Sequence, residues 1–282
     1  MAFYADDGEM AAHSADFDAV IIVTPHTSHI PLGLKFAVLG KHLLLDKPAG
    51  VSAGDVELLA AACREQGVAF GMIFNNRQLP AFRAAKKLLE AGALGDLHRA
   101  VWVCNSWYRS PAYHRSASWR SSWNGECGGL MLNQNPHYLD MWQWFFGLPD
   151  RVYADMQFGR YNDFLVDDAV DIQFSYDNGF HGTFISATGE APGVNRLEIW
   201  GTKGKLTIED GARVFWMKTD CPRKNLEGST RKNSLPSPMK SGKSTWRRGK
   251  TPISRCLQTL PGICWMGSRC LLTAGTDCAP PS

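Results

Sequence analysis

Residues 18–25 read Asp-Ala-Val-Ile-Ile-Val-Thr-Pro, and residues 41–48 read Lys-His-Leu-Leu-Leu-Asp-Lys-Pro. Each stretch is a continuous apolar run that ends in polar residues, which is typical of a strand buried on both faces. Between them, residues 30–39 have the pattern of a helix that ends at Gly40. Two buried strands joined by one helix form a βαβ unit with parallel strands and a right-handed crossover. Ligands bind beyond the carboxyl ends of the strands in such sheets, so we expect a functional site there.

The pattern of the chain changes near Gly95. Before it, residues 52–66 and 78–93 are predicted helices and residues 68–74 a predicted strand, which extends the alternation of a doubly wound sheet. After it, strands predominate, and they are expected at residues 98–107, 152–159, 168–176, 181–187, 195–200 and 205–209. The fold class is therefore α/β plus α+β: a small parallel sheet, then a larger, mainly antiparallel sheet domain with helices on one face.

Residues 128–147 read Gly-Gly-Leu-Met-Leu-Asn-Gln-Asn-Pro-His-Tyr-Leu-Asp-Met-Trp-Gln-Trp-Phe-Phe-Gly. On a continuous helix Asn133 and His137, four residues apart, point the same way. Pro136 leaves two possibilities: the helix kinks there, or it begins there and the preceding residues form a turn. By periodicity alone His137 is either a hydrogen-bonded core residue or part of a site. Polar groups also follow both strands, and Asp46-Lys47 is either a solvated turn or a functional pair.

The composition of residues 221–282 differs from the rest. Eleven of the 30 Lys and Arg residues and five of the eight cysteines fall there, against two acids, Glu227 and Asp277. Aromatic residues between the charges are scarce, so we expect no nucleic-acid partner. No apolar run approaches a membrane span, and no signal peptide or metal-type cysteine spacing is visible. We therefore expect a cytoplasmic protein with reduced thiols, no metal and no membrane contact.

Taken together, these stretches resemble the Gfo/Idh/MocA family of NAD(P)-dependent oxidoreductases, which act on sugars and cyclitols. Asp46-Lys47-Pro48 matches the family's Glu-Lys-Pro motif, and residues 24–29 resemble its loop after the fourth strand of the Rossmann domain. Residues 74–77 look like the loop after the sixth strand. Residues 128–137 resemble the second signature, Asp-x-x-x-His, with Asn133 in place of Asp. The likeness extends over residues 2–220.

The resemblance implies a set of site residues. Lys47, His137 and Asn133 would be catalytic, with Lys47 holding the substrate oxygen and His137 exchanging the proton near its ordinary pKa. Asn133 can orient the His137 ring by hydrogen bonding but cannot offset its positive charge. Contacts to NAD or NADP are expected from the strand-end residues Thr24, Pro25, His26, His29, Asp46, Lys47, Pro48, Asn76 and Arg77.

An aromatic and arginine-rich loop precedes the second signature. Sugars present flat C–H faces to aromatic rings and hydroxyls to arginines, so this loop is either a substrate rim or ordinary packing on the sheet. Its candidate substrate residues are Tyr108, Arg109, Trp119, Arg120 and Trp123.

The sequence departs from the family pattern at two places. It contains no Gly-x-Gly-x-x-Gly turn, which seats the dinucleotide pyrophosphate, so we expect weak or absent cofactor binding by this chain. Residues 221–282 read as a basic, Cys/Ser/Pro-rich tail that is not native-like, which favours an out-of-frame or degenerate end. The expected domains are residues 1–95, a partial NAD(P)-binding Rossmann domain without the glycine-rich turn, and 96–220, an α/β domain for substrate and dimerisation, with 221–282 as the tail.

The implied function is hydride transfer between NAD(P) and the CH–OH group of a sugar or cyclitol, in a homo-oligomer formed through the second-domain sheet. Two alternatives remain open. One is a truncated, non-catalytic pseudoenzyme or dimerisation module, and the other is an NAD-dependent glycoside-cleaving relative. The sugar and the choice between NAD and NADP are not readable from this sequence.

Overall fold

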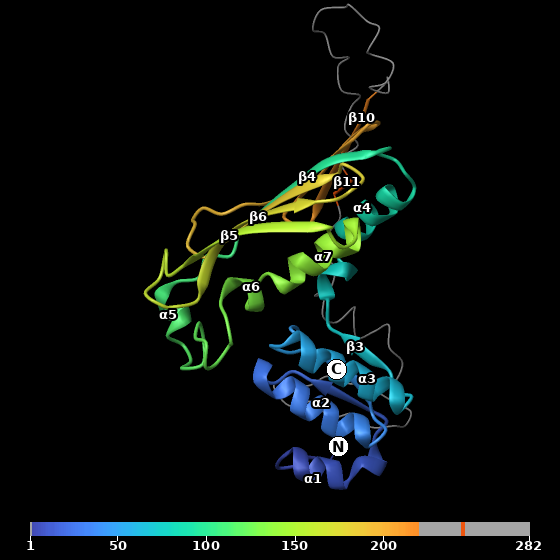
Figure 1. Ribbon diagram of the computed structural model, residues 1–282, viewed down its shortest axis with the longest axis vertical. Helices are drawn as coiled ribbons and strands as arrows, with labels where there is room; N and C mark the ends of the chain where they lie inside the picture. The colour runs from blue at the N-terminus through green and yellow to red at the C-terminus, as the bar shows by residue number, and fades with distance from the viewer. Residues whose placement is uncertain (1, 220–243, 246–282) are drawn as a thin grey trace, which may run out of the picture. The chain divides into compact units, whose positions relative to one another are not determined.

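The computed structural model describes residues 2–219 and 244–245, which form two compact units (Figure 1). The first unit contains residues 2–75 and 117–137, and the second contains residues 76–116 and 138–219 with 244–245. The predicted tail, residues 221–282, therefore lies outside the described residues except for β11 (Ser244–Thr245). The division at residue 95 into a cofactor part and a substrate part stays a prediction.

The first unit contains a three-stranded parallel sheet in the order β1-β2-β3. Its main elements are α1 (Asp7–Ala12), β1 (Ala19–Ile22), α2 (His29–Val38), β2 (His42–Leu45), α3 (Ala53–Glu65) and β3 (Phe70–Met72). The short helices η1 (Ser14–Asp16), η2 (His26–Ser28) and α6 (Leu130–Asn133) also belong to it. Strands β1 and β2 pair in parallel, with Val20 opposite Leu43. The predicted βαβ unit is confirmed.

The core of the first unit lies between this sheet and its helices. Apolar side chains from β1, β2, α2 and α3 form it, and they include Val20, Phe36, Leu45 and Leu59. Leu59 of α3 packs so closely on α2 that a Cβ at Gly33 would lie 2.8 Å from its nearest methyl. The sheet and helices therefore hold the carboxyl ends of β1, β2 and β3, where the site is expected, in a fixed arrangement.

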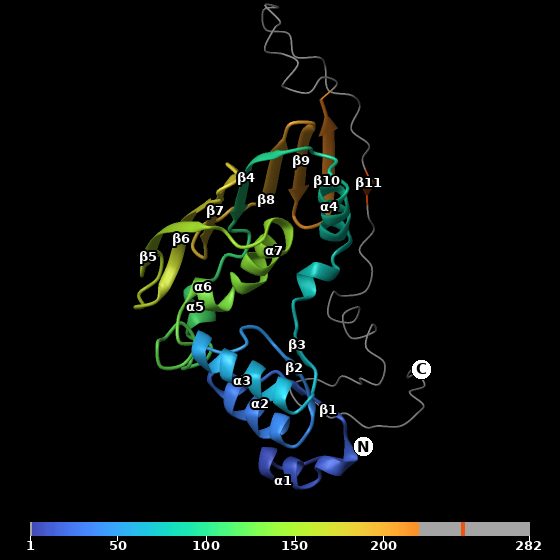
Figure 2. The ribbon, with the colours of Figure 1, turned by 45° about the vertical axis from the view of Figure 1, so that its right-hand side comes forward.

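The second unit is built on an eight-stranded sheet in the order β11-β10-β9-β8-β4-β7-β6-β5 (Figure 2). Its strands are β4 (Leu97–Cys104), β5 (Arg151–Phe158), β6 (Asp167–Ser175), β7 (His181–Ala187), β8 (Asn195–Gly201), β9 (Gly204–Glu209), β10 (Arg213–Lys218) and β11. Within this sheet, the pairing of β4 with β7 is parallel and the other pairings of the described strands are antiparallel. The predicted mainly antiparallel sheet is confirmed.

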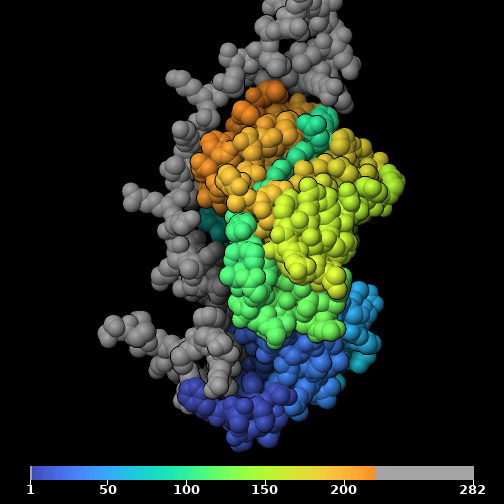
Figure 3. Space-filling view, turned by 90° about the vertical axis from the view of Figure 1, so that its left-hand side faces the viewer, coloured from blue at the N-terminus to red at the C-terminus, as the bar shows by residue number. Residues whose placement is uncertain are grey.

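Helices cover one face of the larger sheet. The helices α4 (Pro80–Glu90) and α7 (Pro136–Phe146) carry Phe82 and Phe145, whose rings contact each other and the fully buried Trp102 of β4. Short helices η3 (Asn75–Gln78) and α5 (Pro111–His114) lie in the connections. On the other face, strands reach the surface side by side (Figure 3). None of the helices in the described residues is long and apolar enough to cross a membrane.

Two local features differ from the simplest sequence pattern. Residues 128–147 do not form one continuous helix, because α6 ends at Asn133 and α7 begins at Pro136. Proline has no N–H to give a preceding carbonyl and suits the first turn of a helix, so the break falls there. Strand β10, which no predicted element covered, pairs with β9 as an antiparallel neighbour.

Candidate functional site

The loop after β1 is fixed by hydrogen bonds among the predicted cofactor residues. The buried His29 ring faces two carbonyl oxygens, with Nδ1 2.7 Å from Pro48 O and Nε2 2.8 Å from Thr24 O. This imidazole therefore ties the residues after β1 to those after β2. The Pro25 carbonyl accepts hydrogen bonds from the Ser28 amide and hydroxyl, and Thr24 Oγ1 lies 2.6 Å from the same hydroxyl.

The ammonium of Lys47 lies directly after β2 and contacts α6. Its Nζ donates to the backbone oxygen of Asn133 at 2.5 Å and to the side-chain Oδ1 of Asn133 at 3.1 Å. Asp46, beside it, continues the sheet through its amide, which donates to Ile22 O at 2.8 Å. Predicted site residues from β2 and from the second signature therefore meet in one unit.

Glu126 completes this cluster and was not predicted. Its side chain is 3% exposed, and Oε1 accepts a hydrogen bond from Nδ2 of Asn133, while Oε2 accepts one from the Ser121 amide at 2.7 Å. Burial raises the pKa of Glu126, and the Ser121 amide, Arg120 and Lys47 oppose that shift. The backbone oxygen of Glu126 lies 3.2 Å from Nδ1 of the buried His26. Burial lowers the pKa of His26, and Lys47 adds to the decrease.

His137 belongs to the same unit and is affected by the same ammonium. Burial, followed by Lys47, lowers the pKa of His137 to about 4, while Asp46 opposes the shift. The expectation that His137 titrates near neutral pH is therefore wrong for this structure. Its Nδ1 is buried and has no hydrogen-bond partner among the described residues, and its ring lies 6.5 Å from that of Phe74. The Asn133 amide, expected to orient this ring, bonds to Lys47 and Glu126 instead.

The residues of the loop after β3 are divided between the two units. Asn75 ends the first unit, and its Oδ1 is buried without a hydrogen-bond partner in the described part of the chain. Asn76 and Arg77, which the sequence predicted to contact the cofactor, begin the second unit. The Arg77 guanidinium donates to both carboxylate oxygens of the buried Asp140, at 2.7 and 2.5 Å. Arg77 and Lys47 therefore lie in different units.

The predicted substrate residues are also divided between the units. Trp119, Arg120 and Trp123 lie in the first unit, where the Arg120 guanidinium is 4.6 Å from the centre of the Trp119 ring and 3.8 Å from Oε1 of Glu126. Tyr108 and Arg109 lie in the second, where Arg109 is stacked 4.7 Å from the Tyr113 ring. Trp123 and Tyr108 are each about half exposed, at 53% and 50%.

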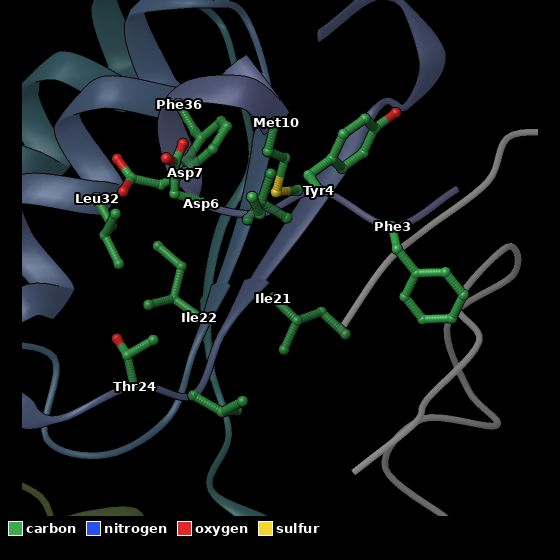
Figure 4. A pocket seen from close by; sticks show the side chains of 13 residues that line it. Phe3, Tyr4, Asp6, Asp7, Met10, Ile21, Ile22, Thr24, Leu32 and Phe36 are labelled. Atoms are coloured by element: carbon green, nitrogen blue, oxygen red, sulfur yellow. The ribbon is translucent and has the colours of Figure 1, made fainter. Parts of the chain in front are cut away.

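A separate hollow of about 430 Å³ lies beside β1 (Figure 4). Its lining is apolar around Ile22 and Leu32 and acidic at Asp6 and Asp7. Thr24 is the predicted site residue that contributes to this lining, whereas Lys47 and His137 do not. The hollow is therefore distinct from the cluster around Lys47.

Comparison with known proteins identifies the family of both units. Residues 1–74 match the family model described as oxidoreductase family, NAD-binding Rossmann fold, and residues 82–207 match the GFO/IDH/MocA C-terminal domain. The trans-1,2-dihydrobenzene-1,2-diol dehydrogenase of Oryctolagus cuniculus is 30% identical over 245 residues, which cover 86% of this chain and 68% of the relative. The Mus musculus enzyme of the same name is 30% identical over 215 residues, which cover 75% and 60%.

A solved structure shows the same fold. The WlbA dehydrogenase from Bordetella pertussis, in complex with NADH and UDP-GlcNAcA, superposes with a TM-score of 0.71 at 24% identity, and the match covers 79% of this chain and 64% of that one. The chain spans 60% of the length of the mouse relative. With family models over both units and a relative matched over two thirds of its length, the chain belongs to the Gfo/Idh/MocA family of oxidoreductases.

Proposed function

We propose that this chain is an NAD(P)-dependent oxidoreductase that transfers hydride between the nicotinamide and a ring CH–OH group of a sugar or cyclitol. The observation that carries the proposal is that the Lys47 ammonium helps to lower the pKa of His137, whose buried Nδ1 has no hydrogen-bond partner among the described residues. The family model for residues 1–74 describes an NAD-binding fold. The rabbit and mouse relatives are named as dehydrogenases of a cyclic diol, and the WlbA complex contains NADH and a nucleotide sugar.

The residues at the strand ends fit the nicotinamide end of such a cofactor. Asn75 Oδ1 and His137 Nδ1 are buried polar atoms without hydrogen-bond partners among the described residues. An unsatisfied buried polar atom costs about 1–3 kcal/mol, a cost that a polar ligand removes. The proposed contacts to NAD(P) are Thr24, Pro25, His26, His29, Asp46, Lys47, Pro48, Asn76 and Arg77. When bound, the nicotinamide supplies the hydride acceptor or donor.

Lys47 would hold the reacting oxygen of the substrate. A hydroxyl or carbonyl oxygen that gains negative charge in the transition state is stabilised by an ammonium in a site that excludes water. The two hydrogen bonds from Lys47 to Asn133 fix the position of that ammonium at the end of β2 before substrate arrives. A preorganised charge of this kind lowers the barrier because little reorganisation is needed during the reaction.

His137 would exchange the hydroxyl proton. With its pKa lowered to about 4, the imidazole is neutral at pH 7 and has the lone pair that a general base requires. The same shift makes the imidazolium a strong acid, so it returns the proton readily to the substrate oxygen in the reductive direction. Asn133 would contribute to the reaction by holding Lys47 in position. It would not orient His137, because no hydrogen bond joins its amide to that ring among the described residues.

The substrate rim is proposed to consist of Tyr108, Arg109, Trp119, Arg120 and Trp123. Exposed aromatic faces and stacked guanidinium groups suit the C–H faces and hydroxyls of a cyclic polyol. The proposal extends to self-association through the strand face of the larger sheet that no described helix covers. We also propose a cytoplasmic location. In that reducing compartment Cys63, Cys104 and Cys127 would stay free thiols, as they are in the structure.

The proposed function is tested by hydride transfer at millimolar cofactor. The purified chain is mixed with NAD⁺ or NADP⁺ and either trans-1,2-dihydrobenzene-1,2-diol or an inositol, and reduced nicotinamide is followed by absorbance. We expect substrate-dependent formation of NADH or NADPH that Lys47→Met abolishes and that the exposed variant Glu65→Gln leaves unchanged. Equal rates in the Lys47→Met and wild-type chains would exclude Lys47 from the reaction.

The same assay separates the two alternatives. A glycoside-cleaving relative releases its product without net formation of NADH, so chromatography would show product while absorbance stays constant. A non-catalytic module shows neither signal with any cofactor or substrate. The absence of a Gly-x-Gly-x-x-Gly turn from the sequence favours this last alternative over the glycoside-cleaving one.

A further inference from the structure

The cluster around Lys47 contains one buried carboxylate, that of Glu126. Its Oε1 accepts a hydrogen bond from Asn133 Nδ2, and its Oε2 accepts one from the Ser121 amide at 2.7 Å. Arg120 is the nearest ion-pair partner, with NH1 3.8 Å from Oε1. A carboxylate on a side chain that is 3% exposed loses most of its hydration, so it persists in the ionised form only where donors and cations compensate.

The chemistry of its neighbours fixes how the Asn133 amide is oriented. An ammonium can only donate hydrogen bonds, and an ionised carboxylate can only accept them. An amide held between the two must therefore turn its oxygen to Lys47 and its NH₂ group to Glu126, as the structure shows. The Glu126 carboxylate thus selects one of the two possible amide orientations, and that orientation presents an acceptor to Lys47.

We propose that Glu126 is a positioning residue that supplies, through the Asn133 amide, the negative charge that an aspartate would otherwise provide beside Lys47. Glu126 does not touch the reacting atoms; it acts through Asn133 on the orientation and charge of the ammonium. This inference rests on the proposed function for its role in hydride transfer, but the coupling between Glu126 and Lys47 exists with or without catalysis.

The proposal explains why asparagine is suited to position 133 in this chain. An aspartate there would place a second carboxylate against Oε1 of Glu126, and two adjacent carboxylates cannot both ionise without strong repulsion. Asparagine at 133 and glutamate at 126 are therefore one of two compatible arrangements. The other has aspartate at 133 and a neutral amide at 126, which keeps one carboxylate in contact with the amide between these two positions.

The test measures the pKa of the Lys47 ammonium directly. The full chain is acetylated with trace acetic anhydride at a series of pH values, and the Lys47 peptide is quantified by mass spectrometry against exposed Lys87. Only the unprotonated amine reacts, so the midpoint of the pH curve gives the pKa of the Lys47 ammonium. A nearby negative charge favours the charged form of a lysine. We expect Glu126→Gln to increase Lys47 acetylation about 3–10-fold at a pH below the wild-type midpoint.

The decisive part of the experiment is a double variant that moves the carboxylate from position 126 to position 133. We expect Glu126→Gln with Asn133→Asp to return the Lys47 midpoint to the wild-type value or above, because the carboxylate is restored beside the ammonium. Asn133→Asp alone should lower the melting temperature, and the added Glu126→Gln should restore it. Glu65→Gln, an exposed acid in the same unit, should change neither the midpoint nor the melting temperature.

Two results would overturn the proposal: an unchanged Lys47 midpoint in Glu126→Gln, or a double variant no closer to wild type than either single variant. If Glu126→Gln does not fold, Asn133→Ala cuts the same connection and should accelerate Lys47 acetylation in the same direction; an unchanged rate there also overturns it. Rates of hydride transfer are read separately. Coupling without hydride transfer refutes the proposed function alone, whereas hydride transfer without coupling refutes the role of Glu126.

Discussion

Among the site residues, His137 has the chemical properties that most strongly indicate a catalytic role. Its buried Nδ1 has no hydrogen-bond partner among the described residues, and its pKa is lowered to about 4. If it is the general base, His137→Ala should lower turnover by about 10²–10⁴-fold, the usual contribution of a positioned acid or base. Turnover is measured at saturating cofactor, with Glu65→Gln as the control. A near-normal rate would remove His137 from the catalytic role.

The lowered pKa of His137 also predicts how stability depends on pH. The unfolded chain binds a proton at the ordinary histidine pKa of 6.5, but the folded chain does so only at about 4. Protonation therefore favours unfolding, and the contribution to stability is complete above pH 6.5 and is lost as the pH falls towards 4. From these values, wild type should lose about 2 kcal/mol more than His137→Gln between pH 7.5 and pH 5.0.

Urea unfolding of both chains at the two pH values measures this difference. Other titrating groups affect both chains alike, so their contributions cancel in the comparison. Equal losses of unfolding free energy in wild type and His137→Gln would show that the imidazole is not buried in its neutral form.

Sequence reasoning found Lys47, Asn133 and His137 but not Glu126. The first three stand in short motifs with recognisable spacing, and their local patterns place them at a strand end and in a helical segment. Glu126 stands between a loop of irregular pattern and two glycines, and nothing in its immediate neighbours marks it as buried. Its role depends on contacts that only the folded chain brings together. The available signal was the replacement of an expected aspartate by Asn133, which calls for an acid elsewhere.

At the scale of elements, the βαβ unit and most strands of the larger sheet follow from pattern alone. Apolar runs and turn residues identify β1, β2 and β5 to β9 because each strand is marked by its own residues. The position of β4 between β8 and β7 is different, since it depends on pairing over long sequence separations. Strand β10 has partly buried residues without clear alternation, so periodicity did not identify it.

The pair formed by Arg77 and Asp140 joins η3 to α7 within the second unit. Two hydrogen bonds at 2.7 and 2.5 Å connect them, and the Asp140 side chain is 6% exposed. Asp140→Asn removes the charge that neutralises Arg77 and leaves one amide donor facing a guanidinium donor. Hydrogen bonds to charged groups contribute about 1.5–3 kcal/mol, so we expect a loss of unfolding free energy in that range.

Asp177→Asn is the matched control for that substitution. Arg151 and Asp177 form an ion pair of 3.0 Å in the same unit, but their side chains are 68% and 73% exposed. Exposed pairs of this kind contribute at most about 1 kcal/mol because water and salt screen them. Chemical unfolding of both variants measures the contrast. Similar losses in the two variants would mean that burial of Asp140 does not strengthen its pair.

At the scale of the whole molecule, the chain has the cluster around Lys47, which we propose contacts the nicotinamide, but its sequence contains no Gly-x-Gly-x-x-Gly turn. In dinucleotide-binding domains that turn places the pyrophosphate at a helix N-terminus, where amide groups and the helix dipole attract it. In the proposed function, the residues around Lys47 contact the other end of the cofactor. Contacts to one end alone leave much of the loss of translational and rotational freedom uncompensated.

We therefore expect this chain to bind NADH or NADPH with a dissociation constant of about 1 mM or weaker, which corresponds to about −4 kcal/mol. Isothermal titration calorimetry measures it, and the nicotinamide mononucleotide half alone should bind with a similar constant because it carries most of the contacts. Lys47→Met should weaken both ligands alike. Micromolar affinity for the dinucleotide, combined with millimolar affinity for the mononucleotide, would show instead that residues of this chain outside the cluster recognise the adenosine phosphate half.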